Sequence, residues 1–245
     1  MARIQRQELK HDEFIDTLDA TLIYVEEHTR TLLIIALAVV LGGGSLGGFY
    51  WYTQQQERKA SVALAKGLIT FQAPVQEGLP PLPGSSVQQT FASQEDKFRA
   101  AEKEFAAVHS DFPRTRSGRL ARHYQALCQF EVGETDAAVA TLEELARARD
   151  TNEAALAKLH LAGFYQRLNR RADAAKLYRE LADHPTDTVP RAMALLELAT
   201  LEATENPEEA RRLYTEIKNE FPDTPIAAEV TQRLELLPAS PPAQP

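Results

Sequence analysis

The sequence predicts an all-α protein, in which one transmembrane helix is followed by an α-solenoid of about three to four helix pairs and a C-terminal capping helix. Three observations lead to this prediction. Residues 31–52 contain no charged side chain, although Asp, Glu, Lys and Arg are frequent around them. Small and bulky apolar residues recur at a spacing of 36 in the second half of the chain. Ala, Leu, Glu and Arg, which favour helices, are abundant elsewhere.

Length and charge limit the classes of function. With 245 residues, the chain can form one ordinary domain with appendages or two small domains. Its net charge of -8 argues against a nucleic-acid partner, because phosphate binding needs a basic surface. The single cysteine, Cys128, excludes an intrachain disulfide and leaves the redox compartment open.

The N-terminal tail, residues 1–30, is predicted to contain an amphipathic helix. Phe14, Leu18, Leu22 and Val25 have the spacing of one helix face. The tail is acidic, and this opposes electrostatic binding to anionic lipid. We expect the helix to lie on the membrane surface or on a partner; the alternative is a partly ordered tail.

Residues 31–52 are predicted to form the transmembrane helix. At about 1.5 Å per residue they make a helix of roughly 33 Å, close to the roughly 30 Å of a bilayer's hydrocarbon core. The segment ends in FYWY (residues 49–52), and such rings collect at the headgroup level. A cleaved signal peptide is the alternative. It is disfavoured by the acidic tail and by the distance to the A-x-A at residues 63–65.

Four glycines in this segment form two overlapping G-x-x-x-G pairs. Gly43 pairs with Gly47, and Gly44 pairs with Gly48. This spacing places glycines on one helix face and allows a second helix to approach closely. They are therefore candidate residues for helix packing in the membrane, unless the stretch is merely flexible.

The flanking basic residues do not decide the orientation of the segment. Arg30 precedes it, and Arg58, Lys59 and Lys66 follow it closely. Counted alone they would place the large domain in the cytoplasm, but long domains are exported largely regardless of such counts.

Residues 53–237 carry a repeat with a period of 36. Three columns of residues keep register through three units, which a generic helical bundle would not require. The columns are Ala138, Ala174 and Ala210, then Leu142, Tyr178 and Tyr214, then Leu145, Leu181 and Ile217. The residues 12 positions before the alanines are Ala126, Ala162 and Leu198.

Turn signals divide each unit into two helices. The turns are predicted at Gly133, at Asn169 and around Glu205 and Asn206, where Gly and Asn give the left-handed end of the first helix. Pro185 and Pro222 are predicted to stop the second helix.

An incomplete unit precedes the three repeats. Ala101, Phe105 and Val108 copy the spacing of a second helix, and residues 57–71 are the candidate for its first helix. A Pro-rich loop, residues 73–90, is expected between them.

A capping helix follows the repeats. Ile226, Val230 and Leu234 stand at steps of i+4 on this helix, which would cover the exposed face of the last unit. Residues 238–245 are expected to be disordered.

The order of small, aromatic, apolar and proline positions resembles the tetratricopeptide repeat. In that family two antiparallel helices form a unit that buries its apolar face against its neighbours. The family's usual period is about 34, so each unit here carries about two extra residues, expected in the loops. The initial Trp of the motif is also missing.

The sequence contains no nucleotide-binding, zinc-protease or redox motif. By letters alone, residues 42–47 match G-x-G-x-x-G, and Ser45 matches the nucleophile of G-x-S-x-G. Both motifs need a strand before them and a helix after, whereas these residues lie in the predicted span. Cys128 is expected to be a small buried hydrophobe. We expect no enzymatic activity, cofactor or small-molecule substrate.

His123 and His160 are the one suggestive pair of titratable residues. They fall on first helices of successive units but are 37 residues apart, and one residue turns a helix by about 100°. The rings are therefore expected to point in different directions, on helices about 10 Å apart. No metal site is predicted, and an enzyme using either histidine is kept as an alternative.

The predicted working surface is the concave face lined by the first helices. Such faces bind extended segments or helices of other proteins. Tetratricopeptide domains that clamp chaperone C-termini use Lys and Asn there, and these are absent. An unfolded or peptide-like client or a partner domain is expected, with ordinary repeat surface as the alternative. The candidate groove residues are His123, Leu127, Phe130, Leu159, Gly163, Gln166, Leu195, Ala199 and Glu202.

The whole arrangement resembles the YfgM-like family of bacterial inner-membrane tetratricopeptide proteins, which are ancillary to the Sec translocon. The resemblance covers roughly residues 12–237 and rests on FIDTLDATLIYVEEHTR, the span, ERKASVALAKGLITF and FPRTRSGRLA. It implies a single-pass inner-membrane protein with a cytoplasmic N-terminus and a periplasmic domain. The implied partners are translocon subunits, a periplasmic chaperone or exported proteins. The Pro-rich loop and the C-terminal Pro run depart from the family.

The function expected from the resemblance is a scaffold or chaperone-like module for exported proteins at the translocon. An adaptor for outer-membrane or cell-wall assembly is the alternative, because EIKNEFPDTPIAAEVTQRL also resembles repeats of outer-membrane assembly lipoproteins. The missing lipobox cysteine disfavours it.

Overall fold

The structure, a computed structural model, describes residues 29–75 and 90–237. In these two ranges every regular element is an α-helix, and the only extended pairing is a parallel bridge between Val75 and Phe91. The chain divides into two units, Met1–Gln56 and Glu57–Pro245. The expected N-terminal amphipathic helix, most of the Pro-rich loop and the C-terminal tail lie outside the described residues.

The described part of the first unit is the beginning of helix α2 (Thr29–Phe71). Its large apolar side chains that the structure describes are exposed, as the aromatic rings of Phe49 and Trp51 illustrate. A Cβ added at the glycines of the two G-x-x-x-G pairs would meet no atom within 4 Å. Among the described residues, no helix combines the length and the apolar character that crossing a membrane requires. The span at residues 31–52 and its packing face stay predictions.

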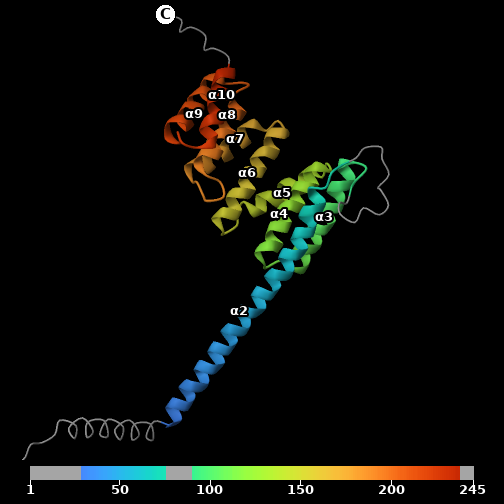
Figure 1. Ribbon diagram of the computed structural model, residues 1–245, viewed down its shortest axis with the longest axis vertical. Helices are drawn as coiled ribbons and strands as arrows, with labels where there is room; N and C mark the ends of the chain where they lie inside the picture. The colour runs from blue at the N-terminus through green and yellow to red at the C-terminus, as the bar shows by residue number, and fades with distance from the viewer. Residues whose placement is uncertain (1–28, 76–89, 238–245) are drawn as a thin grey trace, which may run out of the picture. The chain divides into compact units, whose positions relative to one another are not determined.

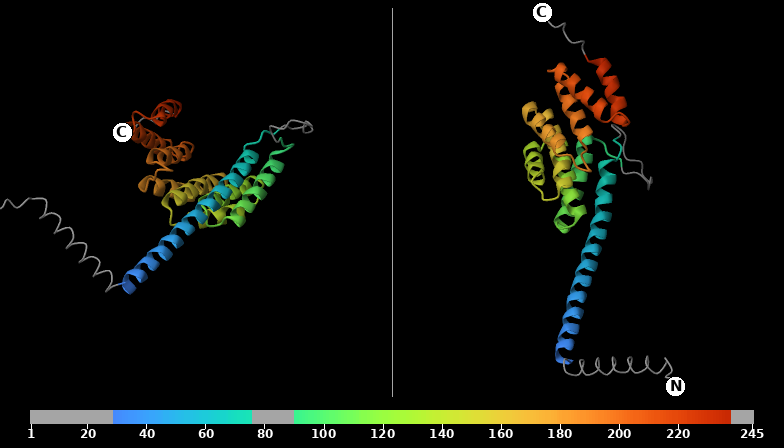
Figure 2. Two further views of the ribbon diagram at one scale, coloured as in Figure 1. Left: turned by 60° about the horizontal axis from the view of Figure 1, so that its bottom comes forward. Right: turned by 90° about the vertical axis from the view of Figure 1, so that its left-hand side faces the viewer.

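The second unit stacks antiparallel helices in chain order (Figures 1 and 2). The end of α2 packs on α3, then α4 pairs with α5, α6 with α7 and α8 with α9, and α10 packs on the last pair. This all-helical stack agrees with the predicted α-solenoid. The helices are α3 (Gln94–Asp111), α4 (Arg116–Glu131), α5 (Thr135–Leu145), α6 (Thr151–Arg167), α7 (Arg171–Asp183), α8 (Arg191–Glu202), α9 (Pro207–Glu220) and α10 (Pro225–Leu236).

The three predicted columns lie in the core of this stack. All nine residues are buried, and Ala138, Ala174 and Ala210 have an exposed fraction of 0%. The residues 12 positions earlier on the preceding helices belong to the same buried cluster. Since the side chains at a crossing set the distance between helix axes, the alanine methyl groups allow each pair to pack closely.

The predicted turn at Asn206 differs from the structure. Gly133 (φ 89°) and Asn169 (φ 59°) adopt the left-handed conformation as predicted. Asn206 has φ -135° and caps α9 instead, where its side chain accepts a hydrogen bond from the Glu209 N–H. The reason is Pro207, because a proline forces the residue before it toward extended backbone.

The predicted helix ends are confirmed. Helices α7 and α9 end two residues before Pro185 and Pro222. Val230 of the capping helix is fully buried, and Ile226 and Leu234 pack partly buried against the main core.

Residues 57–71 form the first helix of the incomplete unit. Gly67 packs directly on α3, since a Cβ there would lie 2.6 Å from the ring of Phe105. At the start of this segment, the Glu57 carboxylate accepts hydrogen bonds from the N–H groups of Arg116 (2.8 Å) and Ser117 (3.0 Å). Burial raises the pKa of Glu57, but hydrogen bonds from the Ser117 hydroxyl and the two N–H groups, together with the charge of Arg119, lower it more, so the net pKa is lowered. Glu57 therefore fixes the N-terminus of α4 to this helix.

Enlarging the alanine of the second unit tests the close crossing. Ala174→Leu is expected to lower the free energy of unfolding by about 1–3 kcal/mol, because the added methyl groups overpack a site without free volume. Urea unfolding followed by circular dichroism measures the change. Ala172→Leu, at an exposed position of the same helix, is the control and should change the free energy by less than about 0.5 kcal/mol. Equal unfolding midpoints for the two variants would refute the close crossing.

Candidate functional site

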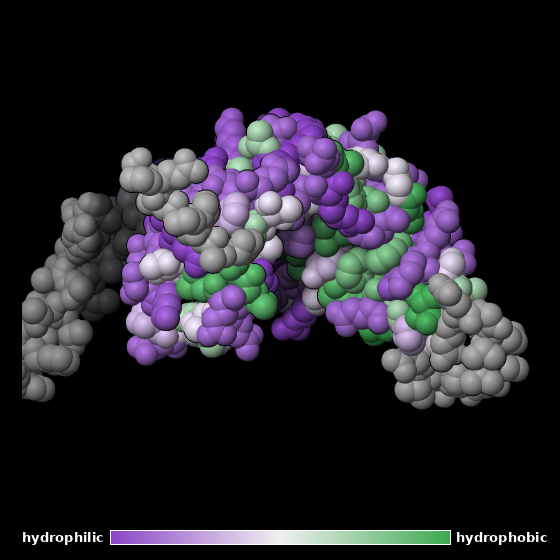
Figure 3. Space-filling view, turned by 90° about the horizontal axis from the view of Figure 1, so that it is seen from above, coloured by the Kyte–Doolittle hydropathy of each residue, from purple (hydrophilic) through white to green (hydrophobic). Residues whose placement is uncertain are grey.

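A groove with a volume of about 420 Å³ lies along the first helices of the repeat units. Most of its lining is apolar, with a few polar groups among the apolar side chains, and this composition is typical of binding sites. In the space-filling view, hydrophobic surface gathers beside a hollow and hydrophilic surface surrounds it (Figure 3). The lining residues are Phe71, Phe98, Leu127, Glu131, Leu159, His160, Gly163, Phe164, Arg167, Tyr178 and Glu197.

Helix α6 supplies the centre of the groove. Leu159, Gly163 and Arg167 follow each other at steps of i+4 and therefore share one face of the helix. Phe164 stacks on Phe130 of α4, with ring centroids 3.8 Å apart. Arg167 lies over the same Phe130 ring and pairs with Glu131. These contacts fix the wall between α4 and α6 and neutralise the charges at its edge.

Gly163 opens the floor of the groove. A Cβ at this position would have only one neighbouring atom, the hydroxyl oxygen of Tyr178 at 4.0 Å. Packing therefore does not require a glycine here, in contrast to Gly67. A glycine inside a helix costs roughly 0.5–1 kcal/mol relative to alanine. The missing side chain leaves room for an incoming group.

Some polar groups of the groove have no hydrogen-bond or ion-pair partner in the described part of the chain. Among them are the Tyr178 hydroxyl and the Glu197 carboxylate. Burial and then the charge of Glu197 raise the pKa of Tyr178. The pKa of Glu197 is raised, mainly by burial. The charge of Arg233 lowers this pKa, and the charge of Glu229 raises it.

His123 and His160 meet across the interface of α4 and α6, and the prediction that they point in different directions is wrong. Their ring centroids lie 4.9 Å apart in a T-shaped arrangement. Side chains at equivalent positions of two stacked helices point in the same direction, so they do not face each other. Two side chains that meet across the interface must therefore come from positions that are not equivalent in the repeat. The offset of one residue, a rotation of about 100°, thus lets these rings approach.

The two histidines have different environments. His160 lines the groove, whereas His123 is only 4% exposed and lines a separate cavity of about 230 Å³. The His123 Nε2 atom is buried without a hydrogen-bond partner. Burial and then the charge of His160 lower the pKa of His123 to about 3, and burial lowers the pKa of His160. In the described ranges, no three His, Cys, Asp or Glu residues are grouped to hold a metal ion.

The nine predicted groove residues lie in different environments. The groove itself contains Leu127, Leu159 and Gly163. The buried residues of the core include Phe130, Leu195 and Ala199. The remaining three are His123 beside the smaller cavity, Gln166 on the exposed surface and Glu202 in an ion pair with Arg179 (3.4 Å).

Tyr178 and Glu197 are among the groove residues that sequence reasoning missed. Tyr178 belongs to a buried column, and its ring does pack in the core while its hydroxyl reaches the groove. Glu197 is the one charged residue between Arg191 and Glu202 on α8. A lone carboxylate in so apolar a helix is the signal that could have found it.

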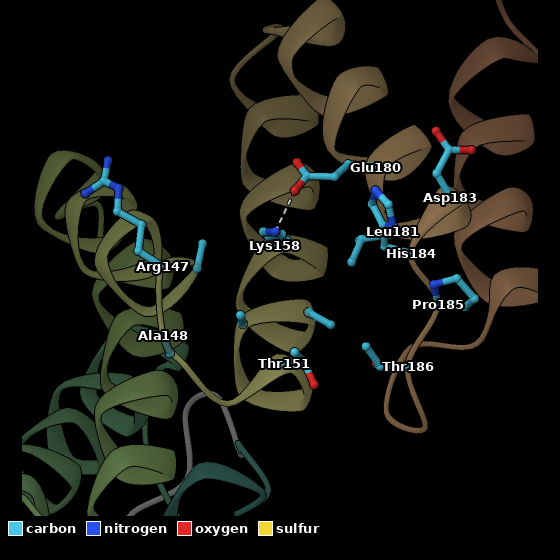
Figure 4. A pocket seen from close by; sticks show the side chains of 13 residues that line it. Arg147, Ala148, Thr151, Lys158, Glu180, Leu181, Asp183, His184, Pro185 and Thr186 are labelled. Carbon is cyan, nitrogen blue, oxygen red and sulfur yellow. Dashed lines mark hydrogen bonds and ion pairs between the residues drawn. The ribbon is translucent and has the colours of Figure 1, made fainter.

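A larger cavity of about 670 Å³ lies against another face of α6. Thr151, Ala155 and Lys158 line it, and at about 100° per residue they lie roughly 80° to 140° around the helix from Gly163. Lys158 and Glu180 point toward each other across it, 2.6 Å apart (Figure 4). Because its cations Lys158 and Arg147 are already paired, with Glu180 and Glu143, this cavity is a weaker candidate than the groove.

No protein-family model matches the chain, and no match to a curated protein is found. Membership of the YfgM-like family stays a prediction.

The buried His123 predicts weaker folding in acid. The pKa of His123 is about 3 in the folded chain against 6.5 as the ordinary value, so between pH 6.5 and 3 the unfolded chain binds this proton and the folded chain does not. The free energy of unfolding should fall by up to about 1.4 kcal/mol per pH unit as the pH drops from 6.5 toward 3. Urea unfolding at several pH values checks this.

His123→Phe should remove most of this pH dependence because the ring stays buried without a titrating nitrogen. His184→Gln, at an exposed histidine, is the control and should keep it. Identical pH dependence in the wild type and His123→Phe would contradict the expectation.

Proposed function

We propose that this protein is a non-enzymatic, membrane-anchored interaction module whose tetratricopeptide-like domain acts as a scaffold or chaperone for other proteins. The observation that carries the proposal is the largely apolar groove, in which the space above Gly163 is unfilled. Concave faces of stacked helix pairs bind segments of other proteins. The clients proposed are exported proteins in contact with the Sec translocon, by the resemblance to the YfgM-like family.

The tetratricopeptide-like assignment is supported by three features of the repeat units. Their period is 36, a buried small residue stands at each helix crossing, and prolines follow the second helices α7 and α9. A chain with such units buries its apolar faces only by stacking them, which produces the groove as a consequence of the architecture.

The membrane anchor is supported by the exposed apolar side chains of α2. Leu33, Ile34, Val40 and Leu46 each expose more than 60% of their surface. Apolar surface in water is unfavourable by about 25 cal/mol per Å², and contiguous apolar patches mark membrane or protein contacts. We therefore propose that residues 31–52 insert into a bilayer, with the repeat domain on the periplasmic side.

Filling the groove floor tests the interaction function. Gly163→Met places a flexible apolar chain into open space without a backbone clash. It is expected to weaken binding of a permanently unfolded, carboxymethylated polypeptide by about tenfold or more, a loss of about 1.4 kcal/mol. The free energy of unfolding should not fall, because Met is a better helix former than Gly.

The matched control is Ala172→Met at an exposed position of α7. It should bind like the wild type when affinity is measured by fluorescence anisotropy. Unchanged affinity in Gly163→Met would exclude the groove as the binding site.

The anchor and its orientation are tested in membranes. Alkaline phosphatase fused after residue 245 is expected to be active in a bacterial host, since that enzyme folds only outside the cytoplasm, whereas a fusion after residue 30 should be inactive. The full chain should also stay in the membrane pellet at alkaline pH, and deletion of residues 31–52 should release it. An inactive C-terminal fusion would count against the orientation, and release of the full chain against the anchor.

A further inference from the structure

Glu197 places a negative charge without an ion-pair partner among the described residues in the groove. It is half-buried on α8 and has no ion pair in the described ranges. Other carboxylates of the repeat units do have cationic partners: Glu131 pairs with Arg167, and Glu202 pairs with Arg179. Removing a charge from water without a partner is unfavourable. An unpaired carboxylate at a binding surface therefore favours a ligand that brings a cation.

The nearby cations of the protein are already engaged. Arg233, whose charge acts on Glu197, donates hydrogen bonds to Glu229 (2.7 Å) and to the Thr200 hydroxyl (2.7 Å). Arg167, the arginine that lines the groove, is held by Glu131. Neither side chain is free to neutralise Glu197. The net charge of -8 acts in the same direction, because it attracts basic partners over long range.

The Tyr178 hydroxyl indicates the conformation of the ligand. The residue is 2% exposed, its hydroxyl has no hydrogen-bond partner in the described ranges, and its oxygen lies beside the open floor at Gly163. The backbone of a helical ligand satisfies its own hydrogen bonds and would leave this hydroxyl unpaired. An extended segment has free N–H and C=O groups that can bond to it.

We infer that the groove binds an extended polypeptide segment in which a bulky apolar side chain lies close in sequence to a lysine or arginine. The apolar side chain occupies the space above Gly163, between Leu159 and Phe164. The cation pairs with Glu197, and the backbone bonds to the Tyr178 hydroxyl. This inference rests on the proposed function and adds the chemistry of the client.

The experiment measures the affinity of the full-length chain for short labelled peptides by fluorescence anisotropy. Each probe is a Gly-Ser peptide with one Phe and one charged residue placed one to four positions after it. The charged residue is Lys in one series and Glu in the other, and a third series carries Ser. At its best spacing, the Lys peptide should bind about tenfold more tightly than the Glu peptide, and added salt should reduce the difference.

Variants of Glu197 assign this preference to one side chain. Glu197→Gln should abolish most of the preference for Lys, and Glu197→Lys should reverse it. Glu208→Gln removes an equal charge at an exposed position of α9 and should leave the preference unchanged. Urea unfolding of each variant confirms that the fold is retained, and the reversal in Glu197→Lys cannot arise from partial unfolding.

The outcomes separate this inference from the proposed function. Equal affinity for Lys and Glu peptides, or a preference that Glu197→Gln leaves intact, overturns the inference even when Gly163→Met abolishes binding. Absence of binding to any peptide and to the unfolded polypeptide overturns the proposed function as well. Tighter binding of a helical peptide, or self-association that Gly163→Met abolishes, would replace the extended segment with a helix or a second copy of this chain.

Discussion

The close helix crossings at Ala138, Ala174 and Ala210 are the constraint on which the repeat domain depends. Each alanine has no exposed surface and stands where two antiparallel helices approach. A larger side chain there would push the axes apart and change the angle passed on to the next unit. Since every unit contacts only its neighbours, the same residue must recur for the stack to continue. The regular period of 36 in the sequence reflects this requirement.

The regular stack also determines where a binding surface can form. Helix α6 is held between its neighbours and presents one face to the groove and another face to the larger cavity. Residues at equivalent positions point the same way, while contacts across an interface join shifted positions. Phe130 and Phe164, 34 residues apart, stack in this way, and His123 and His160 meet at a separation of 37. The geometry of the stack therefore brings together residues that a fixed period does not align.

This explains how far the sequence predicts the structure. The alternation of helices, the buried columns and the proline-terminated ends follow from local spacing, and the structure has them where the sequence predicts them. The groove was only partly predictable. The repeat period identifies the residues that are equivalent between units, but it does not identify the side chains that face each other. Tyr178 shows the difference, since a core column position predicts a buried ring but not a hydroxyl that reaches the groove. Asn206 shows how a neighbour overrides a residue's own preference.

Three features that lower stability coincide in the groove. Gly163 weakens α6 where a side chain would fit, Glu197 holds a half-buried charge without a partner in the described ranges, and the Tyr178 hydroxyl is likewise unpaired there. Each can be removed by a single substitution without a packing penalty, and proteins carry such local costs chiefly where binding requires them. Separate structural explanations would have to place all three on one surface by chance. A ligand that fills the floor, supplies a cation and bonds to the hydroxyl accounts for them together.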